Sequence, residues 1–241
     1  MGGIKLVLKS SISASNLCVS YKEFFRTWKE PLGKIKHIDA LSELCFDIPN
    51  GDVVGLIGKN GAGKSTLLKC IAGMIRPVSG SMTTEGRTIL LSGADPGFFQ
   101  DSTGRQNVIE LAKAYGVEDQ EIEEFCQSIF DFANLGDAID RNVRGYSTGM
   151  RGKLGFGFIT ALRPEILLID ETLGVGDAEF RVKAQNRLKE FVKGSGTVVI
   201  STHSLGLAKE LCNKGILLDS GKNVFYGKIE KTLDKYREIL S

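Results

Sequence analysis

The chain has 241 residues, a length that suits one large domain or one domain with an inserted lobe. Its 42% hydrophobic and 25% charged content is ordinary for a globular protein, and a net charge of +2 gives no overall attraction to nucleic acid. No apolar run approaches the about 20 residues that a membrane-spanning helix needs. We therefore expect the chain to stay in the cytosol and to reach a membrane only through a partner.

Strand-like and helix-like segments alternate along the sequence, which predicts an α/β fold with a mostly parallel sheet covered by helices. Residues 104–163 are mainly helical and form an insertion between two strands of that sheet. The predicted strands cover residues 4–21, 38–48, 52–57, 88–91, 166–170, 197–201 and 215–218, and turns are predicted at 49–51 and 77–80. The predicted helices cover residues 66–72, 105–115, 118–133, 148–162, 178–192 and 228–240.

The segment 22–37 joins the first two predicted strands. It contains both aromatic and basic side chains, a combination that can bind nucleic acid or a membrane surface. An extended hairpin with a solvated basic face explains it equally well. Its aromatic residues are Phe24, Phe25 and Trp28, and its basic residues are Lys22, Arg26, Lys29, Lys34 and Lys36.

Residues 58–65 match the phosphate-binding pattern G-x-x-x-x-G-K-[ST]. The glycines let backbone N–H groups close around a phosphate, and the following helix points its positive end at the same place. Lys64 is predicted to reach the β- and γ-phosphates, and the Ser65 hydroxyl to ligate Mg²⁺. A plain glycine-rich turn is the alternative, but the strand before the loop and the helix after it favour the phosphate site. The predicted nucleotide-binding residues here are Gly58, Lys59, Asn60, Gly61, Ala62, Gly63, Lys64, Ser65 and Thr66.

A second segment with candidate catalytic residues is the apolar run 166–169, which is followed by Asp170 and Glu171. A buried parallel strand delivers both carboxylates to its carboxyl end, where ligands bind in open α/β sheets. Asp170 is predicted to hold Mg²⁺, directly or through water, and Glu171 to orient and deprotonate the attacking water. Taken alone, a solvated strand end would explain the pair, but the phosphate loop about a hundred residues earlier favours the chemical role.

Another apolar strand, at 198–200, leads to His203. A single histidine is commonly structural, but one at a strand end beside a terminal phosphate can sense that phosphate and position Glu171 and the water.

The segment 144–151 places Ser147 before a predicted helix, where it can act as an N-cap. Capping alone is one interpretation. The other is that Ser147, the Gly149 amide and the helix N-terminus form a second anion site. Because this site lies in the helical insertion, it would meet the nucleotide of a second copy.

Together these segments resemble the nucleotide-binding subunit of an ABC transporter, and the resemblance covers essentially the whole chain. It implies ATP and Mg²⁺ as ligands and a single ATPase domain over residues 1–241. That domain would have a mostly parallel core sheet, an antiparallel N-terminal β subdomain, a helical subdomain at about 104–163 and a C-terminal helix at about 228–240. Tyr21 matches the aromatic residue that stacks on adenine in the family, although a core or hairpin tyrosine is an alternative.

Several segments depart from the common family pattern. Residues 146–150 read Tyr-Ser-Thr-Gly-Met where most members have Leu-Ser-Gly-Gly-Gln, and residues 172–180 replace the usual Ser-Ala-Leu-Asp loop. The stretch 91–99 lies where the Q-loop is expected but lacks its Gln, which leaves the usual magnesium contact unassigned, and the segment 103–107 follows it. These variants resemble the subfamily that exports bacterial surface polysaccharides, namely O-antigen, capsule and teichoic acid.

This resemblance implies a homodimer that holds two ATP molecules between the phosphate loop of one copy and the Ser147 segment of the other. It also implies an integral membrane permease as partner, docked between residues 93–100 and 104–116, with the cargo glycan contacted mainly by the permease and no nucleic acid bound. Phe98 and Phe99 would be exposed contacts there or part of the local core. The subunit is expected on the cytoplasmic face of the bacterial inner membrane.

The main rival from another class is a non-transport ABC-type ATPase in repair, translation or cofactor assembly. Translation factors of this kind usually carry two ATPase domains, and repair proteins carry a long coiled coil. A GTPase needs Asn-Lys-x-Asp, whereas residues 213–216 lack the Asp. A nucleotide kinase would leave Ser147 and His203 without a role.

The five cysteines are widely spaced and mostly flanked by apolar residues, so we expect buried, reduced thiols. They are Cys18, Cys45, Cys70, Cys126 and Cys212.

Overall fold

The computed structural model describes residues 10–27, 30–92, 96–170, 177–194 and 196–240. A six-stranded sheet forms the centre, with strand order β5-β6-β7-β3-β8-β9. Neighbouring strands run parallel except for β8 and β9, which form an antiparallel hairpin. The strands are β3 (Val53–Ile57), β5 (Thr88–Ser92), β6 (Ile166–Asp170), β7 (Thr197–Ser201), β8 (Lys214–Asp219) and β9 (Lys222–Lys228).

The strands of this sheet are apolar because both of its faces are covered. Within β6, Leu167 and Ile169 pack into one apolar cluster, while Ile166 and Leu168 pack into another on the opposite face. All residues of β3 and β7 are buried, which is the pattern of central strands in a parallel sheet. The first cluster includes side chains from the helices that follow residue 103, and the second lies between the core sheet, the helix after β3 and the N-terminal strands.

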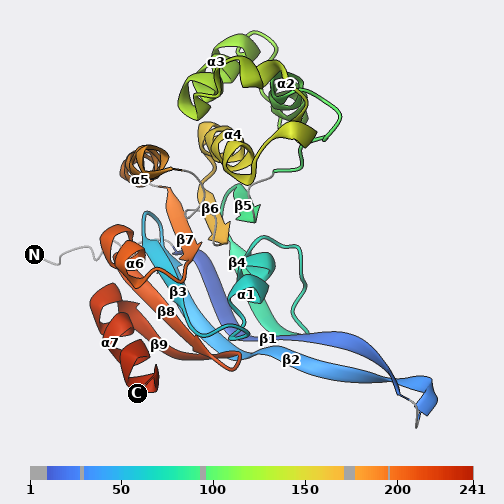
Figure 1. Cartoon of the computed structure of the whole chain (residues 1–241). Coiled ribbons are helices and arrows are strands. Elements are labelled where there is room, and N and C mark those ends of the chain that lie inside the picture. Colours follow the sequence, from blue (N-terminus) through green and yellow to red (C-terminus); the bar gives the residue numbers. More distant parts are fainter. Residues whose placement is uncertain (1–9, 28–29, 93–95, 171–176, 195, 241) are drawn as a thin grey trace, which may run out of the picture.

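A second sheet is antiparallel and has the order β2-β1-β4. Its strands are β1 (Ser10–Thr27), β2 (Glu30–Pro49) and β4 (Ser79–Thr84). Figure 1 shows that β1 and β2 continue as a long two-stranded arm beyond the rest of the protein. The separate stretch predicted for residues 22–37 is therefore wrong in its described part, because pairing runs on to Phe24 opposite Ile35 and Phe25 opposite Lys34. Trp28 and Lys29 lie outside the described residues.

The arm exposes apolar side chains. Phe24 is 64% exposed and Ile35 is 62% exposed, and a Cβ added at Gly33 would lie 2.1 Å from the Phe24 ring. Gly33 also has a φ of 72°, which glycine adopts readily in a turn. Its lack of a Cβ permits the close approach of the Phe24 ring. For residues 22–37, the described backbone matches the extended hairpin that was one of the two interpretations of the sequence.

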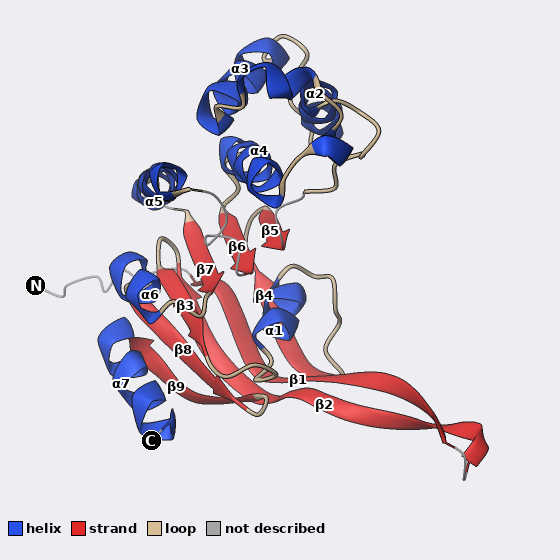
Figure 2. Cartoon of the chain, in the orientation of Figure 1, coloured by secondary structure: helices blue, strands red, loops and turns tan. Residues whose placement is uncertain are grey.

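Three α-helices and two short 3₁₀ helices lie in the insertion between β5 and β6, which are neighbours in the core sheet. Figure 2 shows α2, α3 and α4 grouped at one end of the molecule. The α2 helix begins with a capping box formed by Thr103 and Gln106. The helices and short 3₁₀ turns here are α2 (Gly104–Ala114), α3 (Ile122–Ala133), η1 (Gly136–Asp140), η2 (Val143–Gly145) and α4 (Thr148–Ala161).

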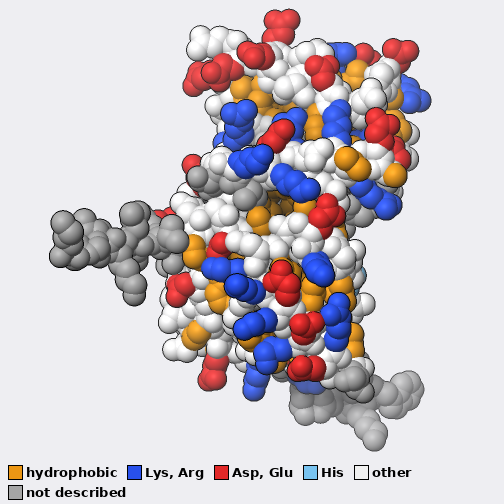
Figure 3. Space-filling view, turned by 90° about the vertical axis from the view of Figure 1, so that its left-hand side faces the viewer, with side chains coloured by type: hydrophobic (Ala, Val, Ile, Leu, Met, Phe, Trp, Pro, Cys, Tyr) orange, Lys and Arg blue, Asp and Glu red, His pale blue; other side chains and the backbone are white. Residues whose placement is uncertain are grey.

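The remaining helices flank the core sheet. The α7 helix packs against β8, β9 and β3 through residues that include Ile229 and Leu233. Figure 3 shows the face on the left of Figure 1, where Lys and Arg side chains lie among Asp, Glu and apolar side chains. Charges of both signs are thus spread over this face, in keeping with the net charge of +2. These helices are α1 (Lys64–Ile71), α5 (Ala178–Lys193), α6 (Leu205–Leu211) and α7 (Ile229–Leu240).

Two strands and one α-helix of the described residues were missed by the sequence-based prediction for identifiable reasons. The β4 strand, Ser-Gly-Ser-Met-Thr-Thr, is polar and mostly exposed at the edge of its sheet, and it begins inside the turn predicted at 77–80. The β9 strand is the other missed edge strand, at the end of the core sheet. The α6 helix has only seven residues and contains Gly206, so its periodicity is weak.

The five cysteine thiols are all free. Cys70, Cys126 and Cys212 are buried, and burial raises the pKa of each thiol, to about 12 for Cys212. Cys18 is half-buried and Cys45 is exposed, so the expectation of burial is wrong for Cys45.

Candidate nucleotide-binding site

The phosphate loop connects β3 to α1 at the carboxyl edge of the core sheet. Two of its glycines are required by the local geometry. A Cβ at Gly58 would lie 2.3 Å from the carbonyl oxygen of Leu218, so the loop can cross β8 only with glycine there. Gly63 has a φ of 101°, and a Cβ there would lie 2.7 Å from Cδ2 of Leu41. The loop is thus held between the core sheet and the N-terminal sheet.

Lys64 is the first residue of α1 and is only 7% exposed. Its Nζ donates hydrogen bonds to the carbonyl oxygens of Gly58, at 2.8 Å, and Lys59, at 3.0 Å. The ammonium group therefore lies across the loop rather than extending into solvent. A buried ammonium requires such partners, because transfer of an unpaired charge from water is strongly unfavourable.

The strand register brings Asp170 beside the phosphate loop. Asp170 on β6 is paired with Ser201 on β7, and Ser201 is paired with Leu56 on β3. These residues form one row across three adjacent strands, and the row ends two residues before Gly58. Ser201 is 1% exposed, and its Oγ has no hydrogen-bond partner among the described residues. Glu171, the predicted base, is the next residue after Asp170 and lies outside the described residues.

A cavity of about 590 Å³ opens above the loop. The cavity contains both the phosphate loop and His203, which follows the end of β7. Ser65 and His203, which are 138 positions apart in the sequence, thus line one cavity. The lining residues are Ala40, Asn60, Gly61, Gly63, Lys64, Ser65, Thr66 and His203.

The residues at this edge fit a nucleotide-bound Mg²⁺. Mg²⁺ prefers oxygen ligands and is usually held by one or two protein groups together with phosphate oxygens and waters. Ser65 supplies an exposed hydroxyl in the cavity, and Asp170 supplies a half-buried carboxylate at the strand end. Within the described ranges, no group of three or more His, Cys, Asp or Glu side chains could hold a metal ion by itself. This edge therefore suits an ion that arrives with phosphates.

Tyr21 lies on β1, opposite Ile38, and is 40% exposed. Its Oη lies 3.2 Å from Oγ1 of Thr66, a residue that lines the cavity. The ring is therefore on the cavity side of the β1–β2 sheet and is available for stacking, whereas a core tyrosine would be buried.

Replacing Tyr21 by Ala is expected to raise the KM for ATP about tenfold, because base–aromatic stacking contributes about 1–3 kcal/mol. Tyr21→Phe keeps the ring and loses only the hydrogen bond to Thr66, so its KM should stay within about threefold of wild type. Steady-state ATPase kinetics on both variants make the test. Equal KM values for Tyr21→Ala and wild type would remove the stacking role.

Ser147 is the N-cap of α4, as predicted, and its Oγ accepts a hydrogen bond from the Met150 N–H at 3.2 Å. Ser147 is exposed, and Gly149 is half-buried in the first turn. Neither residue lines the cavity above the phosphate loop. The structure thus brings the loop, Asp170, His203 and Tyr21 together within one copy and leaves the Ser147 segment apart from them.

Residues 41–174 match the ABC transporter family. An O-antigen export system ATP-binding protein from Klebsiella pneumoniae is 35% identical over 202 residues, which are 84% of this chain and 82% of that protein. The chain belongs to the ABC transporter family.

Two further comparisons agree with this assignment. A teichoic acids export ATP-binding protein from Listeria innocua is 37% identical over 207 residues, 86% of this chain and 62% of that protein. A solved structure of an ATP-binding subunit of an ABC transporter matches with a TM-score of 0.81 at 22% identity, covering 96% of this chain and 99% of that chain. The predicted fold class, a mostly parallel core sheet with an antiparallel N-terminal sheet, is confirmed.

The structure gives a physical reason for one variant of the family signature. Tyr146, which stands where most ABC transporter ATPases have Leu, is 6% exposed and donates a hydrogen bond from Oη to the carbonyl oxygen of Ala138 at 2.6 Å. The ring thereby ties the start of α4 to η1. A Cβ at Gly104 would lie 2.2 Å from this hydroxyl, so Gly104 and Tyr146 are matched. Met150 packs against the core, so its position is also explained by packing.

One structural residue was missed by the sequence analysis, although its segment was singled out. Asn107 on α2 is 1% exposed. Its side chain accepts from the Phe99 N–H at 2.6 Å and donates to the Phe99 and Thr103 carbonyl oxygens at 3.0 and 2.9 Å. It therefore fixes the backbone of the loop before α2. A polar residue on the apolar face of a predicted helix was the available signal.

The same loop is paired with the segment that leads to Ser147. The Arg144 N–H donates to the Gln100 carbonyl oxygen at 2.9 Å, and the Val143 N–H donates to the Ser102 carbonyl oxygen at 3.0 Å. Arg144 also forms an ion pair with Asp101. Residues 99–103 and 141–144 thus form one connected unit at the base of the helical insertion. Residues 93–95 of the predicted Q-loop lie outside the described residues.

A second contact joins α4 to the residues that follow the Asp170 strand. Lys153 Nζ lies 2.6 Å from Oδ2 of Asp177, and this hydrogen bond lowers the pKa of the Asp177 carboxyl. Oδ1 of Asp177 accepts from the Phe180 N–H at 2.8 Å, in the first turn of α5. Residues 172–176 of the variant loop lie outside the described residues.

Proposed function

We propose that this chain is the ATP-hydrolysing subunit that powers export of a surface polysaccharide or lipid-linked glycan through a separate transmembrane permease. The observation that carries the ATPase part is the single cavity lined by the phosphate loop and His203 at the strand edge of Asp170. The proposed cargo is inferred from the relatives, whose names describe export of O-antigen and teichoic acids. Residues 1–241 act as one ATPase domain in this proposal.

The roles of the site residues follow from their chemistry and position. Lys64 and the amides of residues 58–66 hold the β- and γ-phosphates, and Tyr21 stacks on the base. Ser65 and Asp170 hold Mg²⁺, which neutralises phosphate charge when it is bound. Glu171 orients the attacking water and takes its proton, and His203 contacts the terminal phosphate and positions the water.

The Ser147 segment acts on a second copy of the chain. It lies outside the cavity of its own chain and presents a capped helix N-terminus, which attracts anions. Two copies arranged head to tail would place each Ser147 and Gly149 against the nucleotide of the other. Closure of this dimer on ATP, and its loosening after hydrolysis, would supply the mechanical work.

In this proposal, the energy of dimer closure is transferred to a membrane partner. Among the helices in the described part of the chain, none is both long and apolar enough to cross a bilayer. The proposed docking surface lies at the base of the helical subdomain, residues 104–163, where Phe98 is 6% exposed and Phe99 is 66% exposed. Phe98 is thus a core residue and Phe99 is the contact. The subunit would sit on the cytoplasmic face of the inner membrane, without binding nucleic acid.

Phe99→Asp is expected to abolish recovery of the permease while leaving ATP affinity within about twofold of wild type. The side chain is exposed, and Asn107 holds the backbone at this position, so the substitution should not disturb the fold. A charge in an apolar interface loses contact area and must be desolvated. Val78→Asp is the matched control, because Val78 is also 66% exposed but lies before β4. Loss of the permease in both variants, or in neither, would exclude Phe99 as the specific contact.

The experiment that tests the whole proposal is a pull-down of tagged Glu171→Gln protein, with ATP, from detergent-solubilised membranes of its source. A slow hydrolysis variant keeps the ATP-bound assembly together long enough to isolate it. Recovery of a multi-span membrane protein would support the exporter function and identify the subunit that contacts the glycan. Recovery of a soluble partner, or of the homodimer alone, would favour a non-transport ABC-type ATPase and remove the polysaccharide cargo.

A further inference from the structure

A second cavity lies at the opposite end of the core sheet from the nucleotide site. Its volume is about 510 Å³, within the range of small-molecule sites. Pro164 and Glu165 immediately precede β6, and Gly196 immediately precedes β7, whereas Asp170 and His203 are at the other ends of these strands. The remaining lining residues come from the end of α4 and from the last two turns of α5.

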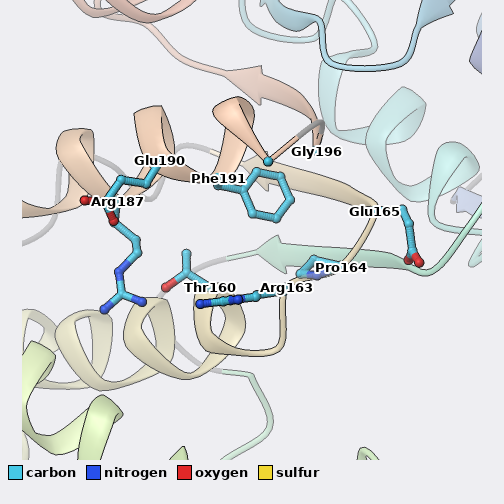
Figure 4. A pocket seen from close by; sticks show the side chains of 9 residues that line it. Thr160, Arg163, Pro164, Glu165, Arg187, Glu190, Phe191 and Gly196 are labelled. Atoms are coloured by element: carbon cyan, nitrogen blue, oxygen red, sulfur yellow. The ribbon is translucent and has the colours of Figure 1, made fainter.

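Two arginines converge on this cavity. Arg163 follows the end of α4, and Arg187 comes from α5. Figure 4 shows that both guanidinium groups lie beside Thr160, one reaching across from each side. Neither arginine forms an ion pair with any residue in the described part of the chain. Two positive charges therefore face one space without a carboxylate bound to either.

Two carboxylates, those of Glu165 and Glu190, also line the cavity, but neither forms an ion pair with these arginines. Oε2 of Glu165 accepts a hydrogen bond from the Arg87 N–H at 2.8 Å, and Figure 4 shows its carboxylate turned away from both guanidinium groups. Glu190 is exposed on α5 and makes no ion pair with Arg187. The guanidinium carbon of Arg187 lies 4.6 Å from the centroid of the Phe132 ring, a contact that holds the side chain in place.

The other wall of the cavity is apolar and fixed. The ring of Phe191 lies against Gly196, where an added Cβ would lie 2.2 Å from Cε1 of the ring. Pro164 is buried beneath the same space. Arg163 has a φ of 45°, a conformation that glycine adopts more readily, so an arginine here keeps its side chain at some conformational cost. The cavity thus combines a rigid aromatic face with two guanidinium groups.

We propose that this cavity binds a small phosphomonoester that carries an aromatic or apolar group. A phosphate ester has a charge of about −1.5 to −2 at neutral pH, which matches two cations better than a carboxylate does. The planar guanidinium groups suit two-pronged hydrogen bonding to phosphate oxygens, and the Phe191 ring offers a face for the organic part. The cavity volume also exceeds what inorganic phosphate alone would fill.

This ligand would contact three elements, of which β6 ends at the nucleotide site. The α4 helix begins at Ser147, β6 ends at Asp170, and α5 is capped by Asp177. A molecule bound between the opposite ends of these elements would fix their relative positions and change the rate of ATP turnover. That rate effect rests on the proposed ATPase function, whereas binding of the phosphomonoester does not.

Phenyl phosphate is a suitable probe, and calorimetric titration of the full-length protein measures its binding. We expect one site that saturating ADP with Mg²⁺ does not displace, and tighter binding than that of benzoate or inorganic phosphate. Arg187→Met and Arg163→Gln should each weaken binding at least about tenfold, since each removes a charge-assisted hydrogen bond. Arg181→Gln is the matched control, because Arg181 is an exposed arginine of α5 outside the cavity, and its affinity should be unchanged.

Three outcomes would overturn the proposal: no binding of phenyl phosphate by the wild-type protein, displacement of the bound probe by ADP with Mg²⁺, or unchanged affinity in both cavity variants. Arg187 packs on Phe132, so thermal melts must show that Arg187→Met folds. Should it unfold, Arg163→Gln decides the matter, because Arg163 is exposed in a turn and its replacement leaves the core intact.

Discussion

Glu171→Gln is expected to lower ATP turnover about 10²- to 10⁴-fold while leaving ATP affinity unchanged. The amide has nearly the same size and can still accept a hydrogen bond from water, but it cannot take the proton. Single-turnover hydrolysis and equilibrium nucleotide binding measure the two effects separately. Because hydrolysis releases the dimer in the proposed cycle, the variant should also form an ATP-dependent dimer that size-exclusion chromatography detects.

The strand that precedes Glu171 is described up to Asp170. The register of β5, β6, β7 and β3 aligns Ser92, Asp170, Ser201 and Leu56 in one row at the edge where the phosphate loop begins. Glu179→Gln is the matched control, since Glu179 is an exposed carboxylate shortly after the same segment. Wild-type turnover in Glu171→Gln would remove the assignment of Glu171 as the base.

The parts of the fold that could be predicted are those in which local pattern and burial agree. The strands β3, β6 and β7 are short apolar runs bounded by turns or charged residues, and the structure places them next to one another. Because parallel strands end at the same edge of a sheet, β3 and β7 bring the phosphate loop and His203 to one edge. Edge strands such as β4 have no buried face to impose an apolar pattern, so composition alone does not identify them.

The long arm illustrates a different limit. The charges of residues 22–37 left an extended hairpin as only one of two interpretations, because strand prediction relies on one buried face. In the structure, pairing between β1 and β2 continues well past the body of the protein, with Phe24 opposite Ile35 in the register. Backbone pairing of two strands does not need a core beneath it once the hairpin is anchored at its base.

The second site at the far end of the sheet could not be predicted from the sequence either. Arg163 and Arg187 are separated by a strand and most of a helix, and each alone resembles an ordinary surface arginine. Only the packing of α5 over the turn between α4 and β6 brings the two guanidinium groups to the same space. Sequence motifs detect residues that are close along the chain, whereas this arrangement depends on tertiary contacts.

Lys64→Ala is expected to weaken ATP binding about 10- to 100-fold, because it removes charge-assisted hydrogen bonds that contribute about 1.5–3 kcal/mol to binding. In the structure the Lys64 ammonium is held by the carbonyl oxygens of Gly58 and Lys59 inside the loop. It is therefore positioned before ATP arrives, and little side-chain freedom is lost on binding. Equilibrium titration with a fluorescent ATP analogue measures the change.

Two controls separate a loss of phosphate contact from a loss of loop structure. Lys69→Ala removes the same kind of side chain from an exposed position of α1, and it should bind ATP normally. Lys64→Ala also leaves the two loop carbonyls without the ammonium, so thermal melts without nucleotide show how much the loop itself is destabilised. A large fall in affinity with a small change in melting temperature would assign Lys64 to the phosphates. Unchanged ATP affinity would instead count against residues 58–65 as the nucleotide site, and with it against the ATPase function that the rest of the proposal requires.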